Sequence, residues 1–142
     1  MTLNMTTSER EEFLADVHVG VISISREGRA PLSAPIWYSY EPGGDVLVGM
    51  GRSSKKGLLI ETGTMVSLCA QDENPPYKYV TVEGPVVSIT DTNTDKDTRP
   101  MAIRYLGEHL GNGYADESSD EGGIQVRIKP EVWLTIDYGK SS

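Results

Sequence analysis

The stretch KYVTVEGPVVSI, residues 78–89, is the longest β-like run of the chain and decides the fold that the sequence predicts. Its alternating β-branched and aromatic residues are typical of a strand. Gly84 and Pro85 interrupt the run near its middle, and a proline cannot donate to a regular ladder. We therefore expect either a bulge here or a strand that bends from one sheet into another, as strands do at the corners of small barrels.

Further β-like segments lie on both sides of this run, separated by short polar turns and by a proline-containing loop. We expect strands at residues 17–25, 34–40, 46–50 and 65–70, and a last hairpin of 124–129 and 132–138 around Pro130-Glu131. Pro35 suggests an edge strand or a strand start. Consecutive hairpins with few helices favour a mainly β fold: an antiparallel barrel of Greek-key type with peripheral helices.

Two helices and one loop complete the expected outline. Thr7 or Ser8 could cap a helix over residues 9–15, with Glu11 at capping-box spacing from Ser8. Residues 95–106 predict a helix that Pro100 either divides or restarts. The glycine- and acid-rich residues 107–123 predict a mobile loop.

Composition limits the class of protein. The chain has 142 residues with 37% hydrophobic and 24% charged, which fits one globular domain, expected over residues 8–140 behind a flexible N-terminus at 1–7. Thirteen Lys and Arg against 21 Asp and Glu give a net charge of −8, which opposes nucleic-acid binding. We find neither a secretory signal nor an apolar run of about 20 residues, and the single Cys69 offers no disulfide, so we expect a cytoplasmic protein without a membrane partner.

A basic segment, Arg52-Ser53-Ser54-Lys55-Lys56, stands out against this acidic background. It opens what the sequence predicts to be a short helix, where the backbone dipole disfavours cations. An anionic ligand would reverse that effect, because N–H groups, hydroxyls and cations would converge on it. The alternative is a solvated surface helix with ordinary lysines.

The sequence offers no self-sufficient catalytic set. His18 and His109 lie near no serine elbow or Cys-His signature, Cys69 sits in an apolar strand, and metal-ligand spacing is missing. A chain with an anion site but no such machinery often takes its chemistry from a cofactor. Trp37 is a candidate to face a planar ring, although packing in the core of a small barrel explains most of the aromatic residues, Trp133 included.

The chain resembles the pyridoxamine 5′-phosphate oxidase-like split-barrel proteins, which bind FMN, and most closely their actinobacterial branch that uses flavin or the deazaflavin coenzyme F-420. The resemblance covers about residues 8–140 and rests on GVISI at 20–24, PIWY at 35–38, GRSSKK at 51–56, PPYKYVTVEG at 75–84 and VRIKPEVW at 126–133. It implies a split β-barrel homodimer with two cofactor sites at the interface. The phosphate motif Ser-x-Lys falls on Ser54 and Lys56.

The resemblance also implies the remaining cofactor-binding residues. We expect Arg52, Ser53 and Lys55 beside the phosphate, and Pro35, Ile36, Trp37 and Met50 near the ring. The oligoglutamate tail of F-420 needs further cations, and the candidates are Lys78 and Arg29. Leu59–Gly63 departs from the Asn-Leu-x-x-Asp-Pro run of many relatives. The long C-terminal extension of true pyridoxamine-phosphate oxidases is missing, which argues against vitamin B6 as the substrate.

The expected function is hydride transfer between reduced F-420 and an unidentified planar, unsaturated small molecule. One alternative keeps the site and replaces F-420 with FMN. Another is a non-catalytic protein that holds a flavin, a deazaflavin or a heme-like ligand.

Overall fold

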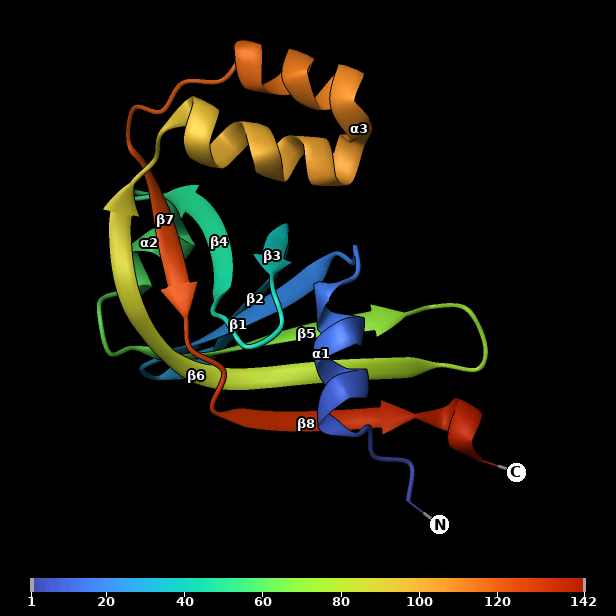
Figure 1. Cartoon of the computed structure of the whole chain (residues 1–142). Coiled ribbons are helices and arrows are strands. Elements are labelled where there is room, and N and C mark those ends of the chain that lie inside the picture. Colours follow the sequence, from blue (N-terminus) through green and yellow to red (C-terminus); the bar gives the residue numbers. More distant parts are fainter. Residues whose placement is uncertain (1, 142) are drawn as a thin grey trace.

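A computed structural model describes residues 2–141 (Figure 1). In chain order its elements are α1 (Thr7–Ala15), β1 (Gly20–Arg26), β2 (Arg29–Ile36), β3 (Tyr38–Tyr40), β4 (Val46–Gly51), α2 (Lys55–Leu59), β5 (Met65–Asp72), β6 (Lys78–Asp91), a π-helical turn (Thr94–Thr98), α3 (Arg99–Asp116), β7 (Gly123–Ile128), β8 (Val132–Asp137) and a 3-10 turn (Tyr138–Lys140).

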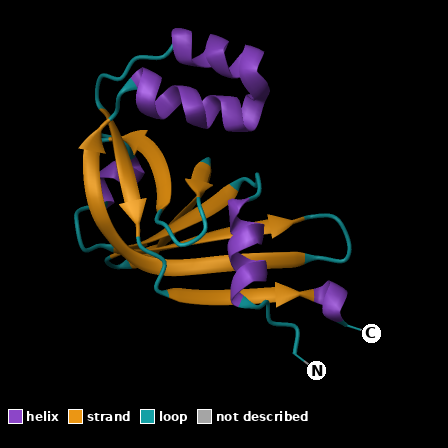
Figure 2. Ribbon diagram, in the orientation of Figure 1, coloured by secondary structure: helices purple, strands orange, loops and turns teal. Residues whose placement is uncertain are grey.

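Strand β6 bends at Gly84-Pro85, as the sequence predicts. Before the bend it pairs with β5 and β8, and after the bend it pairs with β7. A Cβ atom on residue 84 would lie 1.7 Å from the carbonyl oxygen of Lys129, so only glycine allows the two backbones to come this close. The bend carries β6 from one half of the sheet into the other (Figure 2).

The eight strands form one curled antiparallel sheet in the order β2-β1-β5-β6-β7-β4-β3, with β8 beside β6. The sheet closes to a half-barrel around an apolar core that includes Ile22, Leu68, Val82 and Val126. The expected mainly β class is confirmed, and β2, which contains Pro35, lies at an edge of the sheet as expected.

The expected hairpin of β7 and β8 is wrong. Both strands pair with β6, where Ile128 is opposite Val86 and Val132 is opposite Glu83. Residues 129–131 pass the bend of β6, and the N–H groups of Lys129 and Glu131 donate to the carbonyls of Pro85 and Glu83. The two strands therefore follow one another along β6, and Pro130 marks a crossing between sheet halves rather than a turn.

The expected mobile loop at 107–123 is also wrong over most of its length. Residues 108–116 continue α3, which reverses at Gly107, where φ is +83°. The result is a helical hairpin, residues 94–116, that lies above the β4 and β7 end of the sheet (Figure 1). Gly111 permits the two arms to approach, since a Cβ there would lie 2.5 Å from Cα of Ile103. Pro100 stands in the first turn of α3, where its missing N–H costs nothing.

Arg99 joins the two arms of the helical hairpin. Its guanidinium donates to Asp95 on the first arm, at 3.0 Å, and to Asp116 and Asn112 on the second, at 2.9 and 2.8 Å. These bonds raise the pKa of the guanidinium, so the charge that holds the arms together persists at any ordinary pH.

At the N-terminus, Thr6 caps α1 in place of the expected Thr7 or Ser8, and its capping-box partner is Glu9 rather than Glu11. The segment expected to be flexible meets the sheet: the Leu3 carbonyl accepts from the N–H of Asp137, and the N–H of Met5 donates to Thr135. Within residues 2–141, no helix has the length and apolar character to cross a membrane.

Candidate functional site

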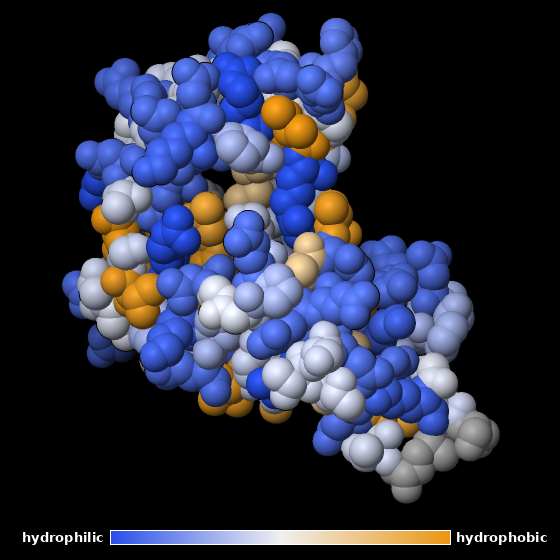
Figure 3. Space-filling model, in the orientation of Figure 1, coloured by the Kyte–Doolittle hydropathy of each residue, from blue (hydrophilic) through white to orange (hydrophobic). Residues whose placement is uncertain are grey.

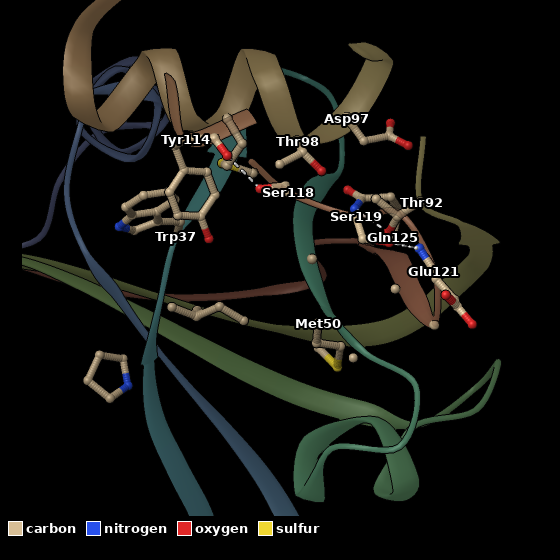
Figure 4. A pocket seen from close by; sticks show the side chains of 17 residues that line it. Trp37, Met50, Thr92, Asp97, Thr98, Tyr114, Ser118, Ser119, Glu121 and Gln125 are labelled. Carbon is tan, nitrogen blue, oxygen red and sulfur yellow. Dashed lines mark hydrogen bonds between the residues drawn. The ribbon is translucent and has the colours of Figure 1, made fainter. Parts of the chain in front are cut away.

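The hairpin pocket, a cavity of about 520 Å³, lies between the helical hairpin and the sheet (Figure 4). Its walls come from the β2–β3 junction, the end of β4, the segment between β6 and α3, α3 itself, the segment that follows α3, and β7. They include Pro35, Ile36, Trp37, Met50, Thr92, Asp97, Thr98, Met101, Tyr114, Ser118, Ser119, Glu121 and Gln125. Figure 3 shows the molecule hollowed below the hydrophilic hairpin.

Trp37 lies where the strand expected at 34–40 breaks into β2 and β3. Its indole stacks on the ring of Tyr105, with centroids 5.0 Å apart and planes 6° apart, and Tyr114 lies tilted at 5.6 Å. The Tyr105 hydroxyl is within 2.6 Å of the His18 carbonyl oxygen and 2.9 Å of that of Tyr38. It also accepts from the N–H of Tyr38. The tryptophan is therefore held in a fixed orientation at one end of the pocket.

Arg104 fastens the helical hairpin to the half-barrel. Its guanidinium donates to the carbonyl oxygens of Tyr38, Ala15 and Asp16, and it lies over the rings of Tyr38 and Tyr105. Tyr38 is buried, which raises the pKa of its phenol, and its hydroxyl donates to the Leu14 carbonyl. Tyr38 thus supports the wall of the pocket and is not an acid for chemistry inside it.

The other end of the hairpin pocket is polar. Gln125 is 8% exposed, and its Nε2 donates to the Thr92 hydroxyl at 3.0 Å. Gly49 stands opposite Gln125 on β4, and a Cβ there would lie 3.0 Å from that Nε2. Asp97 and Glu121 border the same end (Figure 4). The pocket therefore has an aromatic end at Trp37 and Tyr114, and a polar end at Gln125.

The basic segment, Arg52–Lys56, begins directly after Gly51, which borders the pocket. Ser54 is the N-cap of α2: its hydroxyl accepts from the N–H of Gly57 at 3.0 Å and donates to the Gly51 carbonyl at 2.6 Å. A Cβ on Gly57 would lie 2.2 Å from that same carbonyl oxygen. The segment is therefore a tight turn wrapped against the start of α2.

Of the three cations in the basic segment, one forms an ion pair and two do not within residues 2–141. Arg52 pairs with Asp91 at 2.6 Å, and its backbone N–H donates to the Gly122 carbonyl. Lys55 is exposed, Lys56 is partly buried, and neither makes an ion pair with another residue in the range 2–141. Two cations thus remain available to an anion at this turn.

Four of the nine expected site residues line the hairpin pocket, and the other five lie next to it in the sequence. Pro35, Ile36, Trp37 and Met50 line the hairpin pocket, whereas Arg52–Lys56 lie beyond its edge at Gly51. The sequence reasoning missed Gln125, Thr92 and Tyr114. Tyr114 falls in the segment taken for a loop, and a single glutamine in an alternating strand carries no signal of its own.

Trp133, His18 and Cys69, which were also considered from the sequence, lie outside the hairpin pocket. Trp133 packs edge-on against Tyr40 and below the Arg10 guanidinium, away from the hairpin pocket. His18 stacks on Phe13, and Cys69 lies on the outer face of the sheet, beside a separate hollow that also touches Pro35. Among residues 2–141, no group of His, Cys, Asp and Glu side chains is arranged to hold a metal ion.

The chain is similar to several solved structures. An F-420 reductase superposes with a TM-score of 0.74 at 18% identity over 87% of this chain and 94% of the other. An FAD-binding protein from Mesorhizobium loti gives 0.68 at 19% identity over 93% and 94%. A pyridoxamine 5′-phosphate oxidase-type protein from Listeria innocua gives 0.61 at 13% identity over 83% and 87%. The sequence matches no protein-family profile and no curated protein.

These similarities, together with the curled sheet, define the class of fold. The chain has the split-barrel fold of the pyridoxamine 5′-phosphate oxidase-like proteins, as the sequence resemblance implied.

Proposed function

We propose that this protein is an oxidoreductase that binds coenzyme F-420 and transfers a hydride between the reduced cofactor and a planar, unsaturated small molecule. The observation that carries the proposal is the adjacency of two features. Pro35, Ile36, Trp37 and Met50 line an aromatic-walled pocket. One residue beyond its edge at Gly51 starts a turn with two lysines that form no ion pair within residues 2–141. A phosphorylated planar ring system combines the two chemistries that these features can bind.

The ring would lie in the hairpin pocket. Indole, aliphatic and thioether side chains from Trp37, Ile36 and Met50 supply the apolar contacts that a flat ring requires. Trp37 is held by Tyr105 and Tyr114, so no ordering of its side chain is needed when the ring binds.

The phosphate would lie at the basic segment. Lys56 and Lys55 supply charge, and Ser53 supplies a hydroxyl. Ser54 already uses its hydroxyl to cap α2, so donating to a phosphate would require it to exchange its bond to Gly51. Arg52 would contact the phosphate only after its ion pair with Asp91 breaks. Lys56 is therefore the principal phosphate ligand in this proposal.

When bound, reduced F-420 supplies the hydride. The chain's own residues bind and orient: Trp37 and Met50 fix the plane of the ring, and the helical hairpin covers one side of the pocket. The proton that accompanies the hydride comes from solvent at the open side of the pocket, and we assign no protein group to deliver it.

The site would be completed in a homodimer. The outer face of the sheet half that contains β1, β5 and β8 exposes Val21, Met65, Val132 and Leu134. Pro35 belongs both to the hairpin pocket and to the hollow on this outer face. A second copy seated on that face would therefore close the Pro35 side of the pocket. A monomer mass from light scattering after size-exclusion chromatography would contradict this part of the proposal.

The function is tested by titrating the purified protein with F-420 and with FMN, then offering reduced F-420 together with a panel of enones and quinones. The proposal predicts saturable F-420 binding, weaker FMN binding, and oxidation of reduced F-420 that depends on the panel compound. Binding without oxidation across the panel would instead support a sequestering protein.

A flavin is the second candidate cofactor, since an FAD-binding protein shares the fold. The same pocket and basic segment would hold FMN with its phosphate at Lys56. Protein that purifies with a yellow chromophore absorbing near ~450 nm would favour the flavin over F-420.

A further inference from the structure

The polar end of the hairpin pocket presents an amide oxygen and two carboxylates among its hydroxyl groups. Gln125 is buried, and its Nε2 is used by Thr92, whereas its Oε1 makes no hydrogen bond with any residue from 2 to 141. This amide oxygen borders the pocket and is open to it, so a ligand in the pocket can donate a hydrogen bond to it.

Two carboxylates extend the acceptor set. Asp97 and Glu121 border the same end of the pocket, and one oxygen of Asp97 is fixed by the backbone N–H of Asn93 at 2.9 Å. Within residues 2–141, no cationic side chain lines this pocket. Lys96 and Arg127 border a different hollow, although Asp97 and Gln125 touch both spaces. The charge facing this end of the hairpin pocket is therefore negative.

The aromatic end complements this charge. The electron-rich faces of Trp37 and Tyr114 lie at the opposite end of the cavity, and such faces attract cations as well as flat rings. Both ends therefore disfavour an anionic ligand, in contrast to the basic segment outside the pocket.

We infer that the hairpin pocket selects a planar substrate that carries an N–H donor, neutral or cationic, and rejects the corresponding carboxylate. This substrate class rests on the proposed function, in which the F-420 ring occupies the Trp37 and Met50 side of the pocket and leaves the polar end to the substrate. The substrate ring lies at the Tyr114 side of the cavity, beside the cofactor ring, and its amine or amide N–H donates to Gln125 Oε1 or to the carboxylates of Asp97 and Glu121.

A matched set of probes tests the inference. Quinoline-3-carboxamide, 3-(aminomethyl)quinoline and quinoline-3-carboxylate share one ring and differ in donor capacity and charge. Each is titrated into the purified protein by calorimetry at pH 7.5, with and without F-420. We expect the amide and the amine to bind at least about tenfold more tightly than the carboxylate, a difference of about 1.4 kcal/mol.

Variants locate the selectivity. Asp97→Asn combined with Glu121→Gln should bring the carboxylate within about threefold of the amide. The matched pair Glu27→Gln with Glu131→Gln removes two exposed carboxylates elsewhere and should leave the order unchanged, which controls for the net charge of −8. Gln125→Met, of similar length, should weaken the amide and leave the amine less affected, and its thermal midpoint shows whether it folds.

The inference is overturned if the carboxylate binds as tightly as the amide, if no probe binds, or if the distant pair changes the order as much as the Asp97 and Glu121 pair does. Failure of F-420 to bind while the probe order holds would refute the proposed function and leave the selectivity of the pocket standing. If F-420 binds but the probes show no selectivity, the inference about the substrate class is refuted and the proposed function still stands.

Discussion

The indole of Trp37 and the phenol ring of Tyr105 stack with centroids 5.0 Å apart and planes 6° apart. Trp37 belongs to the sheet edge and Tyr105 to the helical hairpin, so the pair joins the two parts that enclose the hairpin pocket. The Tyr105 hydroxyl bonds to backbone groups of His18 and Tyr38, which prevents the ring from rotating away. The shape of the pocket therefore depends on a residue that does not line it.

Replacing Tyr105 with Phe tests this dependence. The variant keeps the stacking but leaves backbone groups of His18 and Tyr38 without a partner, so we expect a loss of about 1–3 kcal/mol of unfolding free energy. F-420 affinity should fall by less than about threefold, because Trp37 still stacks. Urea denaturation and F-420 titration measure the two effects. Tyr77→Phe, at a 54% exposed position, is the control and should change neither.

Gly57→Ala tests whether the turn of the basic segment must be tightly closed. The added Cβ would lie 2.2 Å from the Gly51 carbonyl oxygen and 2.6 Å from that of Arg52, so the backbone has to shift. We expect destabilisation of about 1–3 kcal/mol and loss of F-420 binding. At Gly113 nothing lies within 4 Å of a Cβ, and Gly113→Ala should stabilise the helix by about 0.5–1 kcal/mol. Equal stability of the two variants in thermal melts would contradict the tight turn.

Asp91→Asn releases Arg52 from its ion pair. Both side chains are exposed, at 59% for Arg52 and 86% for Asp91, so the pair is worth at most about 1 kcal/mol. A free Arg52 could turn to the phosphate, and we expect F-420 affinity to rise about two- to fivefold. The gain should disappear in the double variant with Arg52→Gln. Unchanged affinity in Asp91→Asn would remove Arg52 from the proposed site.

Stability at low pH should depend on Glu9. The Lys140 ammonium at 2.6 Å, then the Thr6 backbone N–H, lowers the pKa of this carboxyl from 4.5 to about 2. Because the folded pKa lies below the unfolded one, the stabilisation is complete above pH 4.5 and is lost as the pH falls towards 2. Glu9→Gln should therefore be less stable than wild type at pH 6, and the difference should shrink below pH 4.5 and vanish only below the folded pKa of about 2. Glu27→Gln should follow wild type throughout, and a Glu9→Gln deficit that is constant with pH would contradict the ion pair.

Much of the fold could be predicted from local patterns. Gly84-Pro85 inside a long β-like run predicts the bend of β6, because a glycine and a proline together disfavour a straight ladder. The same kind of local pattern gave a wrong prediction at Pro130-Glu131, where a hairpin was expected. A proline between two strands looks like a hairpin turn, and only the long bent partner shows that both strands follow β6.

The helical hairpin was missed for a related reason. Gly107, Gly111 and Gly113 weaken any helical pattern, yet Gly107 makes the reversal and Gly111 allows the two arms to pack. The hydrogen bonds of Arg99 to Asp95 and Asp116 stabilise the hairpin despite these glycines. Because Arg99 and Asp116 are 17 residues apart, sequence periodicity cannot reveal this contact. Of the pocket residues, Trp37 and Met50 were among the candidates, but Gln125 was not, because a single glutamine in an alternating strand carries no signal of its own.

The most direct test of the central claim is the affinity of F-420 for Lys56→Ala, measured by equilibrium fluorescence titration beside wild type and Lys129→Ala. Lys129 is an exposed cation at the far end of β7, so its loss removes the same charge at a distance from the site. We predict that Lys56→Ala binds F-420 at least about tenfold more weakly, as expected for a charged hydrogen-bond partner, with an unchanged urea midpoint. Lys129→Ala should bind like wild type. Undiminished affinity in Lys56→Ala would contradict the assignment of the basic segment as the phosphate site.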